Sequence, residues 1–289
     1  MNMNTKNFKG KAIYNPSGKA GEYSYWACNF YVGCSNGCTY CYCKKGILAG
    51  AMGGETPKLK SCFKDENHAL EIFEKELKAN SPELQTHGLF FSFTTDPMLP
   101  ETIGLTTKAM NKAVGYFAWD KEQIKVKILT KQTQWLNDKD WKYYIKGDKS
   151  SFWFDLHSQK VKHSVAIGFT LTGHDDLEPN ASTNAERIKA MRKLHKAGFK
   201  TWASIEPVID IKSSREVIKA TNGFCDLYKI GLLSGKTFDR LDLRHFVVMV
   251  SNFTEAKIYF KDSLLKQAGI NRSELPSNCV GRDYSLFND

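Results

Sequence analysis

Strand-like and helix-like segments alternate along most of this chain, and few folds accommodate that alternation. Six apolar runs are typical of buried strands, and segments with helical spacing separate them. The predicted strands cover residues 25–32, 88–95, 124–130, 164–172, 199–206 and 226–233. Strands joined by helical crossovers form a parallel sheet, and six strands fall short of a complete barrel. The pattern indicates a partial barrel or an open sheet, and we predict an α/β fold with a partial (β/α)6 barrel of parallel strands.

The alternation weakens towards the C-terminus. We predict an N-terminal extension over residues 1–22, a barrel over residues 23–235, and a C-terminal extension over residues 236–289 that packs on the barrel. Within this last segment, the apolar run at residues 246–250 is predicted as a seventh, accessory strand.

The clearest helix lies between the fourth and fifth predicted strands. Thr183, with Glu186 three residues later, has the pattern of a capping box at a helix start. Gly198 stands where a left-handed cap would end the same helix. A strand, a helix and a second strand therefore follow one another in this region, as a parallel sheet requires.

Composition and charge restrict the location and the partners of the chain. Of its 289 residues, 42% are apolar and 25% are charged, which allows a sizeable core and excludes wholesale disorder. No apolar run approaches the ~18 residues of a membrane helix, and residues 1–6 lack the apolar stretch expected of a signal peptide. We therefore expect a cytoplasmic protein with no membrane contact. The net charge of +10 is spread along the chain, and it admits a nucleic-acid substrate among the partners.

The cysteines are concentrated in one short segment. The chain has eight, and five of them fall between Cys28 and Cys43. Secreted scaffolds that depend on disulfides are shorter and denser in cysteine. In a cytoplasmic chain, the clustering favours a metal or iron–sulfur site over disulfides.

Three of these cysteines have a spacing suited to a cluster. Cys34, Cys38 and Cys41 form a C-x3-C-x2-C pattern, and Gly33 and Gly37 allow the chain to turn tightly beside them. Three thiolates can hold three irons of a [4Fe–4S] cluster and leave the fourth iron open. An open iron can bind a small chelating ligand.

A zinc site is the alternative interpretation of the same residues. Zinc would need a fourth ligand, for which Cys28, Cys43, Cys62 and His68 are the candidates. Structural zinc sites usually combine two pairs of closely spaced ligands, and this chain has only one C-x2-C pair. On this alternative the protein is a zinc-stabilised adaptor that binds nucleic acid. A non-catalytic iron–sulfur protein is a further alternative.

The cysteine motif and several strand ends resemble a known superfamily. The pattern C-x3-C-x-aromatic-C, with Tyr40 as the aromatic residue, resembles the defining motif of radical S-adenosylmethionine (SAM) enzymes. Other motifs resemble the spore photoproduct lyase-like or "DNA repair photolyase" branch. They are Thr94-Thr95-Asp96-Pro97, Leu129-Thr130-Lys131, Leu177-Glu178-Pro179 followed by Arg187, and Ile205-Glu206-Pro207-Val208. All of them follow or end predicted strands, where ligands bind in parallel α/β folds.

The resemblance implies an enzyme of lyase type that uses two cofactors, a [4Fe–4S] cluster and SAM. The reduced cluster would pass an electron to SAM, and the resulting 5′-deoxyadenosyl radical would abstract hydrogen from the substrate. The substrate is unknown, with nucleic acid among the candidates, and the sequence assigns no catalytic residue. A reducing electron donor such as flavodoxin or ferredoxin is implied as a partner. Spore photoproduct lyases carry a hydrogen-donor cysteine where this chain has Thr94, which argues against thymine-dimer repair.

The resemblance also implies a set of residues around SAM. A hydroxyl or carboxylate of the Thr94–Asp96 segment would hold the amine or methionyl end, and Tyr40 would lie on the adenine side. Lys131 would lie close to the cofactor, and a threonine at the end of the fourth strand would approach its ribose or carboxylate. The predicted cofactor-binding residues are Tyr40, Thr94, Thr95, Asp96, Lys131, Thr170, Thr172, Arg187 and Glu206.

Two charged residues of this set need partners. Arg187 falls in the first turn of a predicted helix, where a cation opposes the helix dipole. We expect it to pair with an anion such as Glu178 or the cofactor carboxylate. Glu206 closes a predicted strand before Pro207, and a buried carboxylate also requires a partner.

Overall fold

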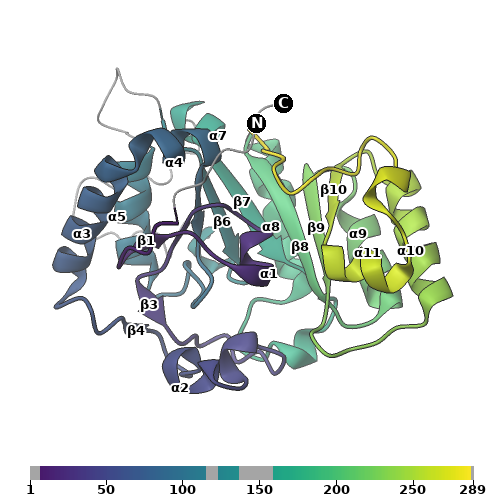
Figure 1. Ribbon diagram of the computed structural model, residues 1–289, viewed down its shortest axis with the longest axis horizontal. Helices are drawn as coiled ribbons and strands as arrows, with labels where there is room; N and C mark the ends of the chain where they lie inside the picture. Colours follow the sequence, from purple (N-terminus) through teal and green to yellow (C-terminus); the bar gives the residue numbers. More distant parts are fainter. Residues whose placement is uncertain (1–6, 115–122, 137–158, 288–289) are drawn as a thin grey trace. The chain divides into compact units, whose positions relative to one another are not determined.

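The computed structural model describes residues 7–114, 123–136 and 159–287. The chain forms two compact units, which are described in turn (Figure 1). The first unit contains Met1–Ser35, Cys41–Ile128 and Lys142–Val165, and the second contains Asn36–Tyr40, Leu129–Trp141 and Ala166–Asp289. None of the described helices is long and apolar enough to cross a membrane.

The strands of the first unit pair in the order β1-β2-β5-β6. Their bounds are Ile13–Tyr14 (β1), Ala27–Cys28 (β2), Leu89–Phe91 (β5) and Val126–Thr130 (β6), and the last two residues of β6 belong to the second unit. β1 is antiparallel to β2, whereas β2, β5 and β6 are parallel. A separate antiparallel pair is formed by β3 (Tyr31–Val32) and β4 (Lys58–Leu59).

Helices of the first unit pack beside these strands. The helices are α1 (Gly18–Gly21), α2 (Leu48–Met52), α3 (Glu66–Ala79), α4 (Ser81–His87), α5 (Ile103–Ala113) and α7 (Gln159–Ser164). Phe73 of α3 places its ring 5.7 Å from that of Phe30 and 6.2 Å from that of Phe91. The Glu76 carboxylate of α3 accepts hydrogen bonds from the backbone N–H groups of residues 11–13. The helix therefore supports both the core and the chain entering β1.

The second unit is a parallel sheet with strand order β7-β8-β9-β10. The strands are β7 (Val165–Thr170), β8 (Lys200–Val208), β9 (Leu227–Leu232) and β10 (Lys257–Phe260). Every residue of β7 and β9 is buried, as expected for strands covered on both faces. The predicted α/β class with mostly parallel strands is confirmed.

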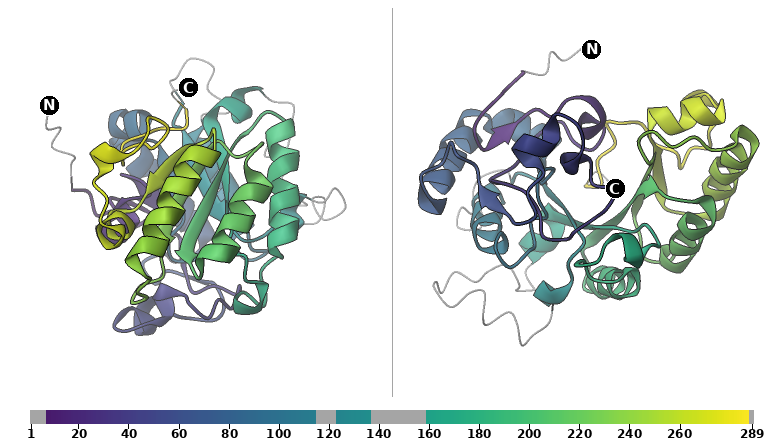
Figure 2. Two further views of the ribbon diagram at one scale, coloured as in Figure 1. Left: turned by 90° about the vertical axis from the view of Figure 1, so that its right-hand side faces the viewer. Right: turned by 90° about the horizontal axis from the view of Figure 1, so that it is seen from below.

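Four α-helices accompany the sheet of the second unit among the described residues (Figures 1 and 2). They are α8 (Asn184–Lys196), α9 (Ile211–Thr221), α10 (Arg240–Phe253) and α11 (Asp262–Ala268). The predicted capping box opens α8, because the Thr183 hydroxyl accepts from the Glu186 N–H and the Glu186 carboxylate accepts from the Thr183 N–H. Gly198 follows α8 with a φ of +91°, as the sequence predicts for a left-handed cap. Short 3-10 helices occur at Tyr42–Lys44 (η1), Gln134–Leu136 (η2), Asp175–Leu177 (η4) and Arg272–Glu274 (η5).

Each of the six predicted strands overlaps an observed strand, but the seventh is wrong. Residues 246–250 lie in the middle of α10, and the next strand is β10. The buried side chains of α10 include Leu243, Phe246, Val247 and Val250. Their spacing is that of one helical face. Because apolar residues follow one another without interruption at residues 246–250, the helical period is not evident from that run alone.

Candidate functional site

Two glycines shape the backbone of the cysteine motif. Gly33, immediately before Cys34, has a φ of +81°, and a Cβ atom there would lie 2.4 Å from the Thr56 carbonyl oxygen. Gly37 has a φ of +71°, and its Cβ would stand 3.1 Å from the Asn180 amide nitrogen. Residues with side chains rarely adopt such angles. The glycines therefore turn the chain before and after the first cysteine of the motif.

The middle of the motif belongs to the second unit and is anchored there by hydrogen bonds. The Thr39 N–H donates to the Leu177 carbonyl over 3.0 Å. The Gln132 side-chain amide donates to Asn36 Oδ1 over 2.6 Å. Cys38, which lies between these two contacts, is buried. The loops that follow β6 and β7 thus hold the segment that carries this cysteine.

The thiols of the motif are not used in disulfides. All eight cysteines lie in the described residues, and none forms a disulfide. Cys43 lies beside Cys41, and a hydrogen bond between them, together with burial, raises the pKa of the Cys43 thiol. In the part of the chain that the structure describes, no three His, Cys, Asp or Glu side chains surround one ion position. A [4Fe–4S] cluster requires a different arrangement, because each thiolate binds a separate iron.

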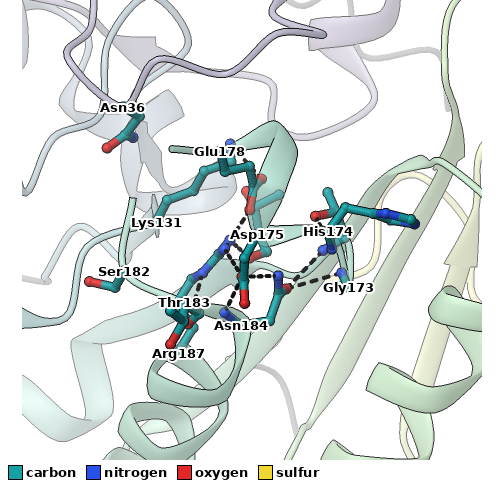
Figure 3. A network of polar contacts seen from close by, with 12 residues as sticks. Asn36, Lys131, Gly173, His174, Asp175, Glu178, Ser182, Thr183, Asn184 and Arg187 are labelled. Carbon is teal, nitrogen blue, oxygen red and sulfur yellow. Dashed lines mark hydrogen bonds and ion pairs between the residues drawn. The ribbon is translucent and has the colours of Figure 1, made fainter. Parts of the chain in front are cut away.

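Glu178 is the centre of a polar network in the second unit (Figure 3). Its side chain has no solvent exposure. One carboxylate oxygen accepts a hydrogen bond from the Tyr40 hydroxyl and lies 4.0 Å from Lys131 Nζ, and the other accepts from Arg187 Nη2. Lys131 Nζ also lies 5.6 Å from the centre of the Tyr40 ring. Burial and the neighbouring carboxylate raise the pKa of Tyr40 well above its usual range, so this hydroxyl stays protonated and donates.

Arg187 connects Glu178 to the end of β7. Its guanidinium is fully buried, and Nη1 donates to the Thr170 carbonyl over 2.6 Å. Nη2 lies 3.6 Å from the Asp175 carboxylate in addition to its bond with Glu178. Two anions therefore offset the helix dipole that opposes a cation in the first turn of α8. The sequence left Glu178 or the cofactor carboxylate as the expected anionic partner of Arg187. In the structure, Arg187 pairs with Glu178.

Asn184 orders the loop after β7. Its side-chain oxygen accepts from the backbone N–H groups of Thr172 and Gly173, each over 3.1 Å. Its side-chain nitrogen donates to the Asp175 carboxylate over 2.6 Å. The Thr172 hydroxyl accepts from the His174 N–H over 3.2 Å. Figure 3 shows this chain of contacts leading from the loop towards Arg187 and Glu178.

The Thr94–Asp96 segment lies in the first unit, and its three polar side chains have different surroundings. The Thr94 hydroxyl donates to the Tyr31 carbonyl over 2.5 Å. The Asp96 carboxylate is buried and accepts from the Met98 N–H over 3.0 Å. The Thr95 hydroxyl is buried and has no hydrogen-bond partner among the described residues. Buried hydroxyls are rarely left in that condition, so Thr95 is the member of this segment best suited to receive a ligand.

Glu206 has a partner of its own. Its carboxylate lies 2.9 Å from Lys261 Nζ, and the Lys261 side chain is almost completely buried. Gly231 of β9 faces this pair, because an added Cβ there would lie 2.8 Å from carbons of both side chains. The partner that the sequence requires for Glu206 is therefore a lysine that directly follows β10.

The structure brings together some of the predicted residues and not others. Tyr40, Lys131 and Arg187 meet at Glu178, and Thr170 joins them through its carbonyl. Glu206 binds Lys261 instead, and the Thr94–Asp96 segment belongs to the other unit. Sequence reasoning missed several residues that hold these groups, and their only signal was a position beside a motif residue or after a strand. They are Asn36, Gln132, Asn184 and Lys261.

Comparison with protein families decides which superfamily this arrangement represents. The family model described as "Radical SAM superfamily" matches residues 28–216, more than half of the chain. The chain belongs to the radical SAM superfamily. The predicted family is confirmed, and with it the prediction of an enzyme. The matched region begins at Cys28, before the cysteine motif, and ends within α9.

Sequence identity between this radical SAM protein and the individual proteins it resembles is low. An uncharacterised protein of Methanocaldococcus jannaschii is 25% identical over 282 residues, covering 90% of this chain and 93% of the relative. Among solved structures, spore photoproduct lyase with dinucleoside spore photoproduct is 15% identical, with a TM-score of 0.49 over 78% of this chain. The chain spans 58% of the length of that lyase. Streptococcus suis SuiB is 13% identical, with a TM-score of 0.44 over 76% of this chain and 48% of its own.

Proposed function

We propose that Cys34, Cys38 and Cys41 hold a [4Fe–4S] cluster and that the protein binds SAM at its open iron. The observation that carries this proposal is the cysteine motif itself, with both neighbouring glycines in left-handed conformation and no disulfide among its thiols. A cluster held there would supply the electron for reductive cleavage of SAM to methionine and a 5′-deoxyadenosyl radical, which would abstract hydrogen from the substrate. A cytoplasmic location is part of the proposal, because thiols persist in a reducing compartment.

The residues of this chain have two kinds of role in the proposed site. Thr95 and Lys131 are the direct ligands that we propose for SAM, because the Thr95 hydroxyl has no hydrogen-bond partner among the described residues and Lys131 brings an amine to within 4.0 Å of Glu178. Tyr40, through its ring, is proposed on the adenine side. The other members of the predicted set each have a protein contact of their own, and we keep them as proposed cofactor-binding residues. They are Thr94, Asp96, Thr170, Thr172, Arg187 and Glu206.

Glu178 controls the position of two of the proposed contacts. Its carboxylate binds the Tyr40 hydroxyl and attracts the Lys131 amine, while Arg187 fixes it from the protein interior. Tyr40 stands two residues after one proposed cluster ligand and directly before another. The network therefore fixes the position of Tyr40 and, with it, the path of the backbone after Cys38. It also keeps Lys131 over the Tyr40 ring.

The proposed substrate is nucleic acid. The excess of 41 basic over 31 acidic residues supports this choice, because phosphate contacts by lysine and arginine dominate such binding. Thymine-dimer repair is not proposed, since Thr94 occupies the position of the donor cysteine. The test is the affinity for single-stranded and duplex DNA and RNA at several salt concentrations. A steep loss of affinity with salt is expected, and a salt-independent affinity would contradict the choice.

The cluster ligands are tested by substitution. Anaerobically reconstituted protein is expected to contain iron and sulfide in the proportions of the cluster and to show broad visible absorbance. Cys34→Ala, Cys38→Ala and Cys41→Ala are each expected to lose most of this absorbance. Cys62→Ala is the matched control and is expected to retain it. A Cys38→Ala protein with full cluster content would overturn the assignment.

The domain limits also stay proposals. We propose that residues 23–235 form the radical SAM core, with residues 1–22 as an N-terminal extension and residues 236–289 as a C-terminal extension that packs on the core. The observation that supports the second part is the pairing of β10 with β9, which adds a parallel strand from beyond residue 235.

A further inference from the structure

The loop that follows the cysteine motif returns to the motif. It starts at Cys41, passes through η1 and α2, and ends where the Cys34 N–H donates to the Gly54 carbonyl over 3.0 Å. A second bond of 3.2 Å joins the Gly33 N–H to the Met52 carbonyl. Both ends of this loop, residues 42–54, are therefore attached to proposed cluster ligands. We call these residues the apolar loop.

The apolar loop exposes side chains that usually lie in a core. Ile47 is 99% exposed, Tyr42 50% and Leu48 41%. None of the residues of α2 is buried, so this short helix has no core-facing side. The described residues include six exposed large hydrophobic side chains, and these are three of them. A group of exposed apolar side chains at one place is typical of an interaction surface.

Lysines flank the exposed side chains in the sequence. Lys44, Lys45 and Lys58 lie in or beside the apolar loop, and Glu55 is the only acidic residue between positions 41 and 59. Lys44 Nζ is 3.7 Å from the Glu55 carboxylate, but Glu55 is 90% exposed, so this pair is weak. A segment that combines exposed apolar side chains with neighbouring lysines is complementary to a partner that has a small apolar contact on an acidic face.

We propose that the apolar loop is the docking surface for an acidic protein that delivers single electrons to the cluster. This inference rests on the proposed function, because a cluster on Cys34, Cys38 and Cys41 must be reduced from outside. Electron transfer falls steeply with distance, so the carrier has to bind near the cluster. Ile47 is six residues after Cys41 and lies within ~20 Å of it even for an extended chain. The apolar loop is thus exposed, anchored to the motif and of the required charge.

The test compares a protein donor with a chemical one. Reconstituted protein is mixed anaerobically with reduced flavodoxin or with dithionite, and cluster bleaching is followed by stopped flow. Lys45→Glu/Ile47→Asp is expected to slow reduction by flavodoxin about 10- to 100-fold and to leave reduction by dithionite unchanged. Leu241→Asp is the matched control, since Leu241 on α10 is 64% exposed and lies far from the motif in sequence. This variant is expected to behave as the wild type with both donors.

Three results would overturn the inference. Unchanged reduction by flavodoxin would show that the apolar loop does not receive the donor. Equal slowing with dithionite would show that the loop maintains the cluster instead. Loss of nucleic-acid affinity with intact reduction by flavodoxin would assign the loop to the substrate. Failure of the proposed function is distinguished from these results, because a wild type without any cluster would be bleached by neither donor.

Discussion

The carboxylate of Glu178 and the guanidinium of Arg187 form an ion pair in which neither side chain is exposed to solvent. The same carboxylate binds Tyr40 from within the cysteine motif. Such a pair is costly to form in the interior and still more costly to break by removing one partner. The loop after β7 and the middle of the motif therefore share one buried charge.

Removal of that charge is expected to destabilise the fold. In Glu178→Gln, the buried guanidinium keeps Asp175, at 3.6 Å, as its anionic partner within the described part of the chain. We expect the free energy of unfolding to fall by about 3 kcal/mol. Asp176→Asn is the control, because Asp176 is 75% exposed and its variant should change stability little. Urea unfolding of both variants measures the difference, and a loss below about 1 kcal/mol for Glu178→Gln would contradict the account.

Neighbouring threonines are expected to respond in opposite ways to the same substitution. Thr94→Val removes the hydrogen bond to the Tyr31 carbonyl and should cost about 1 kcal/mol of stability. Thr95→Val removes a hydroxyl that has no partner among the described residues, so stability should be unchanged or higher. If Thr95 binds SAM, its variant should also weaken SAM binding severalfold by equilibrium dialysis. The assignment fails if Thr95→Val binds SAM as the wild type does.

The lowered pKa of Lys127 predicts that the stability of the protein changes with pH in the alkaline range. Burial lowers its pKa to about 8, and its amine donates to the Tyr23 carbonyl over 3.3 Å. The unfolded chain has a lysine pKa near 10.4, so it binds this proton more tightly than the folded protein does. The contribution of Lys127 to stability is therefore least favourable below pH 8 and becomes more favourable as the pH rises from about 8 to about 10.4.

Lys127→Met should remove this dependence. At pH 7 the variant is expected to be more stable than the wild type by up to about 3 kcal/mol, and the difference should shrink above pH 8. The exposed Lys58→Met serves as the control at each pH. Urea midpoints between pH 7 and pH 10.5 measure the effect. A constant difference across this range would refute the assignment.

The close packing around Gly231 predicts that an added methyl group at this position lowers stability. An alanine Cβ at this position would approach the ion pair of Glu206 and Lys261 to 2.8 Å, and both side chains would have to move. We expect Gly231→Ala to cost about 1 to 3 kcal/mol. Gly104→Ala, in α5 and with open space around it, should instead stabilise the protein by about 0.5 to 1 kcal/mol. Equal effects of the two variants in urea unfolding would show that the pair is not constrained.

The sequence indicates most of the strands because their signal is local. The buried runs that became β7, β8 and β9 are apolar over most of their length, and turn residues limit them. The run at residues 246–250 was misleading because five consecutive apolar residues show no period of their own. Its helical face becomes visible only when Leu243 and Asp239, the N-cap residue directly before α10, are included.

The site could be predicted in part for a similar reason. The cysteine motif and its two glycines are encoded in adjacent residues, so spacing alone indicates their role. The contacts that hold the motif are not local. Gln132 reaches Asn36 across 96 positions, and Tyr40 reaches Glu178 across 138. Tertiary contacts also decide which threonine of the Thr94–Asp96 segment has a hydroxyl without a hydrogen-bond partner among the described residues.

The most direct test of the account is the formation of 5′-deoxyadenosine. The reconstituted protein is reduced with dithionite under anaerobic conditions, given SAM, and analysed by chromatography against a sample of Cys38→Ala treated in the same way. The account predicts 5′-deoxyadenosine from the wild type and none from the variant. A wild-type protein that binds stoichiometric zinc, forms no cluster and produces no 5′-deoxyadenosine would contradict it.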